Sequence, residues 1–201
     1  RFPTLQQSGT FDGPAMPARK PKKLPQIPPR EAINRLLHAT TRQRDRLILL
    51  LMAFMGLRVS EVVKLRVPDF NQETGELFLR QAKGAKDAVL PVPKFLRGPL
   101  RGWIAARTGG PLFQSRKHGG HLTTRAVRYL VKRTAIRAGL PNAGASRVYY
   151  PHVLRHSFCT EKIRAKVPLP YVQRLMRHEQ IQTTMRYTHV VADDLREAME
   201  A

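Results

Sequence analysis

The chain of 201 residues has one cysteine, few acidic residues and no long apolar segment. A single cysteine, Cys159, excludes an internal disulfide and a zinc site built from several thiolates. The longest uninterrupted apolar run, Leu47 to Met55, has nine residues, whereas a helix that crosses a membrane needs about 20. This run therefore predicts a buried helix of a globular protein.

The shortage of acidic residues gives the chain a formal net charge of +22, from 36 Lys and Arg against 14 Asp and Glu. A compact domain this basic repels itself unless it meets a polyanion. Between Ala88 and Thr160 there is no acidic residue at all. Ordinary exposed helices mix both signs, so the pattern favours nucleic acid as the partner. The alternative is a basic surface with counterions and no dedicated partner. A membrane-surface protein would need a basic amphipathic helix with an open apolar face, and the sequence shows none.

Composition divides the chain into three predicted regions. Residues 1–29 contain seven prolines and a basic cluster, which indicates an extended linker, with a plain disordered tail as the alternative. Residues 30–189 carry the predicted helices and strands of a domain. Residues 190–201 are acidic and predict a last helix that docks on a protein surface or points to solvent. The first residue is Arg rather than Met, which suggests a piece of a longer polypeptide.

Hydrophobic periodicity predicts mostly helices with one change of period. Pro29 starts the first helix, Gly56 ends the second, and Ser60 caps or opens the third. Alternation around Leu77 and Leu79, with turn-rich segments on both sides, predicts a small antiparallel sheet of two or three strands. The other helices are expected at about 94–107, 123–138, 152–165, 169–177, 181–189 and 192–200.

The segment from Gly56 to Glu61 places Arg58 at the start of a predicted helix. Free N–H groups and the positive end of the helix dipole favour an anion there. Glu61 lies one turn further and can hold the guanidinium by a hydrogen bond. The alternative is an exposed ion pair worth a few tenths of a kcal/mol.

Lys83 follows Ala82 and precedes Gly84 on a predicted hairpin tip. A lysine that loses water near other cations loses proton affinity and can act as a general acid or base. By itself this segment favours the alternative, a solvated lysine in a turn.

His152, Arg155 and His156 share one face of a predicted helix, so their head groups converge. The two histidines could hold a metal ion, but no carboxylate lies nearby in sequence and Arg155 would repel a cation, so a phosphate fits better. Near the end of the chain come His178 and Tyr187. Most tyrosines are packing residues, yet Tyr187 becomes a candidate nucleophile if arginines neutralise the phosphate that it attacks.

In their order these segments resemble the catalytic domain of the tyrosine recombinase (phage integrase) family. That family carries an Arg in Gly-Leu-Arg-x-x-Glu, a Lys on a β-hairpin, a His-x-x-Arg-His group, a second His or Trp, and a Tyr nucleophile. Here the six positions fall on Arg58, Lys83, His152, Arg155, His178 and Tyr187. The resemblance covers about residues 30–190. It implies the family's fold, which is mainly α with a small antiparallel β-sheet.

The resemblance also implies a reaction. Tyr187 would attack a DNA phosphodiester to form a 3′-phosphotyrosyl link and free a 5′-hydroxyl. Arg58 and Arg155 would bind the non-bridging oxygens, and Glu61 would orient the region of Arg58.

The other family positions imply proton transfer and support. Lys83 would protonate the leaving 5′-oxygen, His152 would act in proton transfer and His178 would hydrogen-bond the phosphate. His156 is expected to support this group. The resemblance implies no metal ion, ATP or other cofactor, because cations already surround the phosphate and the covalent link preserves the bond energy.

The sequence departs from the family pattern at one motif and in one region. The family usually has Leu-Gly-His where this chain has Met176-Arg177-His178. Losing the glycine matters if the backbone there has a positive φ, and Arg177 would instead add a phosphate contact. Family members usually carry an N-terminal domain that closes the clamp around DNA. We expect residues 1–29 to be the linker to it.

The expected partners are double-stranded DNA and further copies of the chain in a homo-tetramer, with no membrane. The acidic tail would pack in trans on a neighbouring protomer or fold back in cis. We expect a cytoplasmic, nucleoid-associated protein of a prokaryotic type of cell. The expected DNA-contacting residues beyond the six are Lys86, Arg125, Arg128, Lys132 and Arg177.

Two alternatives to a site-specific recombinase or integrase remain open. A type IB topoisomerase uses similar Arg, Lys, His and Tyr chemistry but rejoins the same strand. A non-catalytic DNA-binding regulator could be built on the same fold, although the presence of all six positions argues against it.

Overall fold

The computed structural model describes residues 27–80, 87–115, 119–143, 148–185 and 187–188. The helices are α1 (Arg30–His38), α2 (Gln43–Met55), α3 (Val59–Lys64), the 3-10 helix η1 (Val67–Asp69), α4 (Lys94–Ile104), α5 (Thr124–Arg137), α6 (Pro151–Arg164), α7 (Leu169–Met176) and α8 (Ile181–Met185). The strands are β1 (Phe70–Asn71), β2 (Glu76–Leu79) and β3 (Ala88–Pro91). The predicted fold class, mainly α with a small antiparallel sheet, is confirmed.

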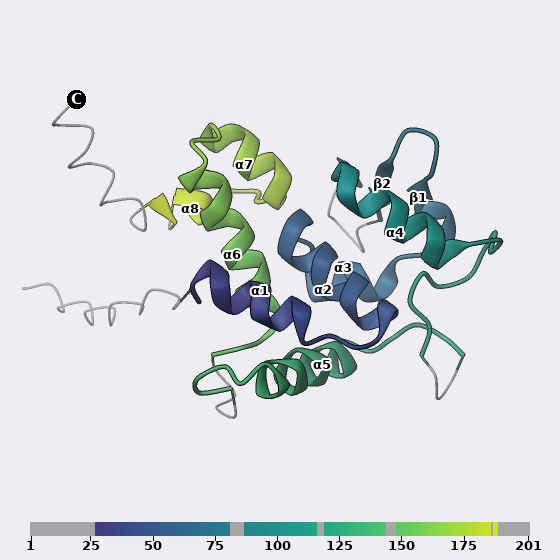
Figure 1. Cartoon of the computed structure of the whole chain (residues 1–201). Helices are drawn as coiled ribbons and strands as arrows, with labels where there is room; N and C mark the ends of the chain where they lie inside the picture. The colour runs from purple at the N-terminus through teal and green to yellow at the C-terminus, as the bar shows by residue number, and fades with distance from the viewer. Residues whose placement is uncertain (1–26, 81–86, 116–118, 144–147, 186, 189–201) are drawn as a thin grey trace, which may run out of the picture.

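Helix α2 lies at the centre of the molecule, with α1, α3, α4 and α6 against it (Figure 1). Its apolar residues are buried apart from the half-buried Leu50 and Phe54, and Leu49, Leu51 and Met52 are fully inaccessible. A helix that is apolar all round belongs in a core, so the longest apolar run of the sequence forms the central helix, as expected.

Helix α2 ends at Gly56, which has a φ of +61°. A Cβ atom at this position would come within 2.5 Å of the Phe158 ring on α6. Both the left-handed backbone and the close approach therefore require glycine. The prediction that Gly56 ends the helix is confirmed.

Helix α3 begins at Val59, and Arg58 is its N-cap residue. The carboxylate of Glu61 accepts a hydrogen bond from the Arg58 backbone N–H at 2.6 Å, which is the return half of a capping box. Of the two roles predicted for Ser60, capping or opening this helix, the first is wrong, because Arg58 is the N-cap residue and Ser60 lies within the opening turn.

The sheet has the order β1-β2-β3 and is antiparallel throughout. Leu77 pairs with Leu90 in register, and both side chains are buried in the main core. The residues next to them along each strand face the other, more exposed side, as expected for a sheet with one covered face.

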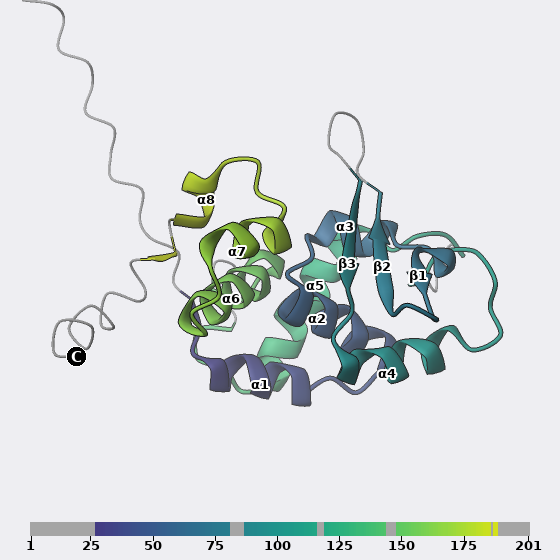
Figure 2. The same ribbon diagram turned by 90° about the horizontal axis from the view of Figure 1, so that it is seen from above.

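Helix α4 packs beside this sheet (Figure 2) and ends at Ile104 rather than near residue 107, because Ala105 takes a positive φ of 47°.

A second, smaller apolar cluster joins α6, α7 and the segment after α8. Its buried members are Phe158, Cys159, Ile163, Val172, Met176 and Tyr187. This cluster fixes the C-terminal end of α7 against α6, next to the end of α2. In the parts of the chain that the structure describes, no helix combines the length and apolarity that a membrane crossing requires.

Candidate active site

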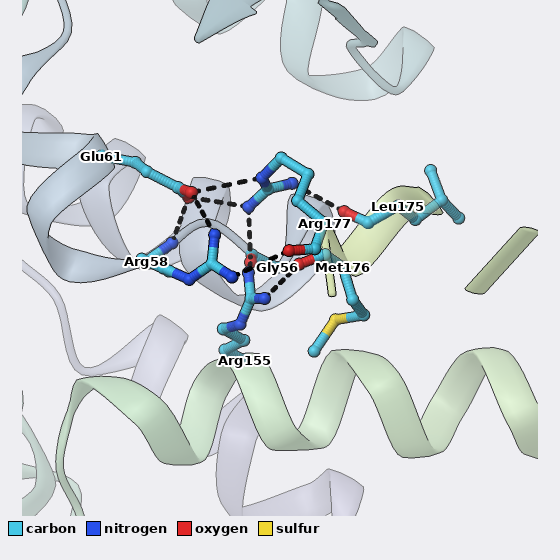
Figure 3. A network of polar contacts seen from close by, with 7 residues as sticks. All are labelled: Gly56, Arg58, Glu61, Arg155, Leu175, Met176 and Arg177. Atoms are coloured by element: carbon cyan, nitrogen blue, oxygen red, sulfur yellow. Dashed lines mark hydrogen bonds and ion pairs between the residues drawn. The ribbon is translucent and has the colours of Figure 1, made fainter. Parts of the chain in front are cut away.

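Three guanidinium groups meet where the N-terminus of α3, the middle of α6 and the C-terminus of α7 come together (Figure 3). They belong to Arg58, Arg155 and Arg177, which we call the arginine cluster. The three residues are far apart in sequence, and Glu61 supplies the carboxylate between two of them. Tertiary packing, rather than local sequence, therefore assembles this cluster.

The C-terminal end of α7 provides the acceptors for two of these arginines. Residue 177 adopts a left-handed conformation, and the N–H groups of Arg177 and His178 return to the carbonyls of Arg174 and Gln173. This is a Schellman motif. Two carbonyls at this helix end remain for other partners. Arg155 donates to the Met176 carbonyl, and Arg58 donates to the Arg177 carbonyl. A helix C-terminus carries partial negative charge, so it suits two cations.

Arg58 is fixed at both its backbone and its guanidinium. Nη1 donates to Oε1 of Glu61 at 2.8 Å, and Nη2 donates to the Arg177 carbonyl at 2.9 Å. Its side chain keeps 33% of its surface exposed. The predicted hydrogen bond from Arg58 to Glu61 is therefore present, and the guanidinium still faces solvent in part.

Arg155 is almost fully buried, with 4% of the residue exposed. Its guanidinium donates to the carbonyls of Gly56 and Met176, which ties α6 to the ends of α2 and α7. Burial, followed by the charges of Arg58 and Arg177, lowers the pKa of Arg155 to about 9. The group is thus cationic at neutral pH, and its orientation is fixed by backbone carbonyls.

Arg177 has a φ of +53° and a ψ of +46°. The family glycine is therefore replaced at a position with positive φ, where a residue other than glycine costs roughly 1–2 kcal/mol. The side chain turns inward and is 6% exposed, with Nη2 at 2.7 Å from Oε2 of Glu61. In this conformation Glu61 and two backbone carbonyls occupy the Arg177 guanidinium, and its predicted contact with a DNA phosphate stays a prediction.

Glu61 is buried and serves both Arg58 and Arg177. Burial alone would raise the pKa of Glu61, but the charge and hydrogen bonds of Arg177, with those of Arg58, outweigh burial and lower it. Glu61 is therefore ionised at neutral pH. A paired and hydrogen-bonded carboxylate is the form in which a buried charge is tolerated.

Tyr187 is 5% exposed, and its hydroxyl shares a hydrogen bond with Nδ1 of His156. Burial, then the charges of His152 and Arg155, lowers the pKa of His156 to about 4. The imidazole is neutral at pH 7 and accepts at Nδ1 when its proton is on Nε2. The structure thus places His156, expected only as a supporting residue, directly beside the candidate nucleophile.

His178 follows the Schellman motif at the end of α7. Its Nδ1 lies 2.9 Å from Oγ1 of Thr184, a fully buried residue of α8. Burial, then the charges of Arg155, Arg58 and Arg177, lowers the pKa of His178 to about 4. His178 is therefore neutral at pH 7. Thr184 orients its ring, and the positive charges of all three arginines act on it.

His152 lies one turn before His156 on α6, and the two ring centroids are 6.4 Å apart. Loss of hydration, then the charges of Arg155, Arg128 and Arg58, lowers the pKa of His152. The influence of Arg128 shows that this exposed residue of α5 lies near the site. The predicted grouping of His152, Arg155 and His156 is present, although Arg155 points inward.

An open groove of about 1850 Å³ is lined by residues of β3 and α7. The cations of its lining, which outnumber the acidic residues Glu61, Asp87 and Glu179, are Arg58, Lys64, Arg80, Arg174 and Arg177. Arg80 and Asp87, at the ends of β2 and β3, also line it. Lys83 and Lys86 fall between them in sequence, outside the described residues, so their predicted roles stay predictions.

The predicted DNA-contacting residues of α5 lie on its outer surface. Arg125 and Arg128 are exposed and Lys132 is half-buried. Within the described residues, no group of three His, Cys, Asp or Glu side chains is placed to hold a metal ion.

Sequence reasoning did not find several groups of this site. Backbone carbonyls accept hydrogen bonds whatever the residue type, so the sequence could not indicate the roles of those of Gly56, Met176 and Arg177. Only the glycine indicated an unusual backbone conformation. Thr184 could not be distinguished from other threonines of its segment, because its partner His178 lies in the loop between α7 and α8.

A mainly helical domain with this cluster of arginines, histidines and a tyrosine beside a basic groove has the arrangement of a tyrosine recombinase catalytic domain. The chain belongs to the phage integrase family, whose model matches residues 29–193. This confirms the resemblance that the six motif positions indicated.

Curated relatives include the tyrosine recombinase XerA of Thermococcus kodakarensis, which is 38% identical over 190 residues. That match covers 92% of this chain and 65% of the relative. The tyrosine recombinase XerC of Xylella fastidiosa is 35% identical over 187 residues, covering 88% of this chain and 61% of the relative. The chain thus spans less than two thirds of the length of these relatives.

Solved structures show the same fold. The XerH site-specific recombinase, in a post-cleavage complex with a palindromic difH substrate, has a TM-score of 0.72 and 27% identity over 88% of this chain and 53% of that one. The crystal structure of XerA recombinase has a TM-score of 0.74 and 24% identity over 91% of this chain and 65% of that one.

Proposed function

We propose that this protein is a site-specific DNA recombinase or integrase that cleaves and rejoins strands through a tyrosyl-DNA link. One observation carries the proposal: Arg58 and Arg155, from different elements, are held by consecutive carbonyls at the end of α7, beside His178 and near Tyr187. Two guanidinium groups fixed in this way suit the two non-bridging oxygens of one phosphodiester.

In the proposed step, Oη of Tyr187 attacks the phosphorus atom. The bond from Oη to phosphorus forms while the bond from phosphorus to the 5′-oxygen breaks. Negative charge grows on the non-bridging oxygens, and the fixed cations Arg58 and Arg155 stabilise it without reorganising. Preorganised donors of this kind contribute roughly 10²–10³-fold in rate each.

Proton movement accompanies this exchange of bonds. Tyrosine has an ordinary pKa of about 10, so its hydroxyl loses the proton as it attacks. Neutral His156, which shares a hydrogen bond with that hydroxyl, is placed to take its proton. Neutral His178 is available to hydrogen-bond the phosphate, and neutral His152 is available for proton transfer. Lys83 would give a proton to the leaving 5′-oxygen. One phosphate ester replaces another, so a 5′-hydroxyl from a second strand can reverse the step without an external energy source.

The proposed substrate is double-stranded DNA, in agreement with the basic groove and the exposed cations of α5. The XerH structure similar to this chain is described as bound to its difH substrate. We further propose a homo-tetramer on DNA, with residues 190–201 contacting a neighbouring protomer, and action on chromosomal DNA in the cytoplasm.

The test is capture of the covalent intermediate. The protein is incubated with duplexes that carry a randomised central site and a nick, so that the cleaved strand loses a short 5′ piece and cannot be rejoined. We expect an adduct on a denaturing gel with the unmodified protein and none with Tyr187→Phe, which retains DNA binding.

Tyr129→Phe is the matched control, because this tyrosine is 65% exposed on α5 and its hydroxyl has no role in the step. An adduct that survives Tyr187→Phe, or the absence of any adduct with the unmodified protein, contradicts the proposal. With a selected duplex, exchange of labelled strands between two molecules separates a recombinase from an enzyme that relaxes supercoils and rejoins the same strand.

A further inference from the structure

Arg177 carries the strongest unexplained feature of the site, because an arginine occupies a left-handed backbone position and turns its side chain away from solvent. Arg177 lines the groove together with Arg174, Leu175 and His178. Its guanidinium nevertheless turns inward, toward the Glu61 carboxylate, and the side chain is only 6% exposed. The inward direction therefore needs a reason within the protein.

The guanidinium of Arg177 is almost completely used by hydrogen bonds (Figure 3). Nε donates to Oε1 of Glu61 at 3.2 Å, and Nη2 donates to Oε2 at 2.7 Å. Nη1 donates to the Leu175 carbonyl at 2.6 Å, and Nη2 also reaches the Gly56 carbonyl at 3.3 Å. The two-point contact with one carboxylate is the geometry that only arginine provides. These contacts join the end of α7 to Glu61 on α3 and to Gly56 at the end of α2.

The Arg58 guanidinium has two attachments, one to a partner of the Arg177 side chain and one to the Arg177 backbone. The first attachment is the Glu61 carboxylate, which Arg58 shares with Arg177. The second is the backbone carbonyl of Arg177, which accepts from Nη2 of Arg58 at 2.9 Å. The charge of Arg177 also lowers the pKa of Glu61, so the anchor of Arg58 stays a carboxylate. The Arg177 side chain thus helps to hold the carboxylate at one side of the Arg58 guanidinium, and the backbone of residue 177 holds the other side.

We propose that Arg177 is a positioning residue that holds Arg58 in the orientation required for phosphate binding, and does not itself contact DNA. This inference rests on the proposed strand-cleavage function. Arg177 also adds one positive charge next to Arg155 and His178 without exposing it, so the phosphate site is more strongly cationic than its accessible groups suggest. A misplacement of about 1 Å in a reacting constellation can cost roughly 100-fold in rate.

The test compares Arg177→Gly, which suits the positive φ and deletes the side chain, with Arg177→Lys, which keeps the charge. Single-turnover adduct formation is measured at saturating DNA, and the Kd is measured separately. We expect Arg177→Gly to lower the rate roughly 10- to 100-fold with little change in Kd, and Arg177→Lys to recover part of the rate. Arg164→Ala is the control, because Arg164 forms an exposed pair with Glu161 on α6.

Three results would overturn the inference. A lower melting temperature of Arg177→Gly with an unchanged rate would make Arg177 a structural brace. A weaker Kd with a salt slope shallower by about 0.9 would make it a phosphate contact. Without DNA, hydrogen exchange of the Arg58 side-chain N–H groups is followed by NMR, and Arg177→Gly should abolish their slow exchange. Unchanged exchange contradicts the inference, whereas a missing adduct with the unmodified protein contradicts the proposed function.

Discussion

The arginine cluster and the outer face of α5 are both strongly basic, yet they hold their cations in opposite ways. In the cluster, Arg155 is 4% exposed and the side chain of Arg177 is 6% exposed. Arg155 donates to a backbone carbonyl, and Arg177 donates to a buried carboxylate. On α5, Arg125 and Arg128 are exposed to solvent. One region fixes geometry, and the other supplies charge.

This difference has an energetic reason. Exposed cations gain little from any single contact because water and salt screen them. They act together by releasing counterions from a polyanion. Burying a cation costs desolvation free energy, so a buried cation is stable only with carbonyl or carboxylate partners. The hydrogen bonds to these partners fix the direction of the guanidinium. The same side-chain type therefore serves orientation in one place and attraction in the other.

The largest expected effect distinguishes direction from charge. Arg155→Lys keeps the positive charge but cannot donate to the Gly56 and Met176 carbonyls with the planar geometry of arginine. We expect single-turnover adduct formation to fall about 10²–10³-fold. The same change at exposed Arg128 should have a far smaller effect on that rate. Equal losses at the two positions would contradict the distinction between the regions.

A smaller effect should appear when α5 loses charge. The double variant Arg125→Gln and Arg128→Gln should bind DNA more weakly, with a log–log salt slope shallower by about 0.9 for each phosphate that the protein no longer neutralises. Cleavage by the bound complex should change much less than Kd. Fluorescence anisotropy across a salt series measures the slope, with Arg164→Gln on α6 as the control. An unchanged slope would place the DNA path away from α5.

The smallest expected effect concerns pH and follows from the buried histidines. The folded-state pKa values of His156 and His178 are lowered to about 4, whereas an ordinary histidine has a pKa of about 6.5. Between these values the unfolded chain binds protons that the folded chain does not, so stability falls as the pH falls from about 6.5 to about 4.

Urea unfolding at pH 7 and pH 5 measures this loss. The double variant His156→Gln and His178→Gln should lose less stability over the same interval. A dependence equal to that of the unmodified protein would contradict the neutral state of these two histidines.

Local sequence was sufficient wherever neighbours in the chain decide the structure. Arg58 and Glu61 are three residues apart at a helix start, so their hydrogen bond could be predicted. The apolar run from Leu47 to Met55 predicted the central helix, and Gly56 predicted its end. The motif order also predicted the family and the fold class.

Local sequence was insufficient where distant segments meet. The inward turn of Arg177 depends on Glu61, which lies on α3 across the fold, and no local pattern indicated this ion pair. Likewise, Ser60 was the better helix cap by residue type, but the folded chain uses the Glu61 carboxylate. Lys83 remains a prediction, because it lies outside the described residues.

The amino-acid sequence by itself determined which chemistry this protein carries, since residue types and their order specify arginine, histidine and tyrosine groups suited to a phosphodiester. Only the tertiary structure decided which arginines hold their direction and which supply charge. The reason is that burial and partner carbonyls, which set the orientation of a guanidinium, come from α2, α3 and α7 together and exist only once these helices have packed.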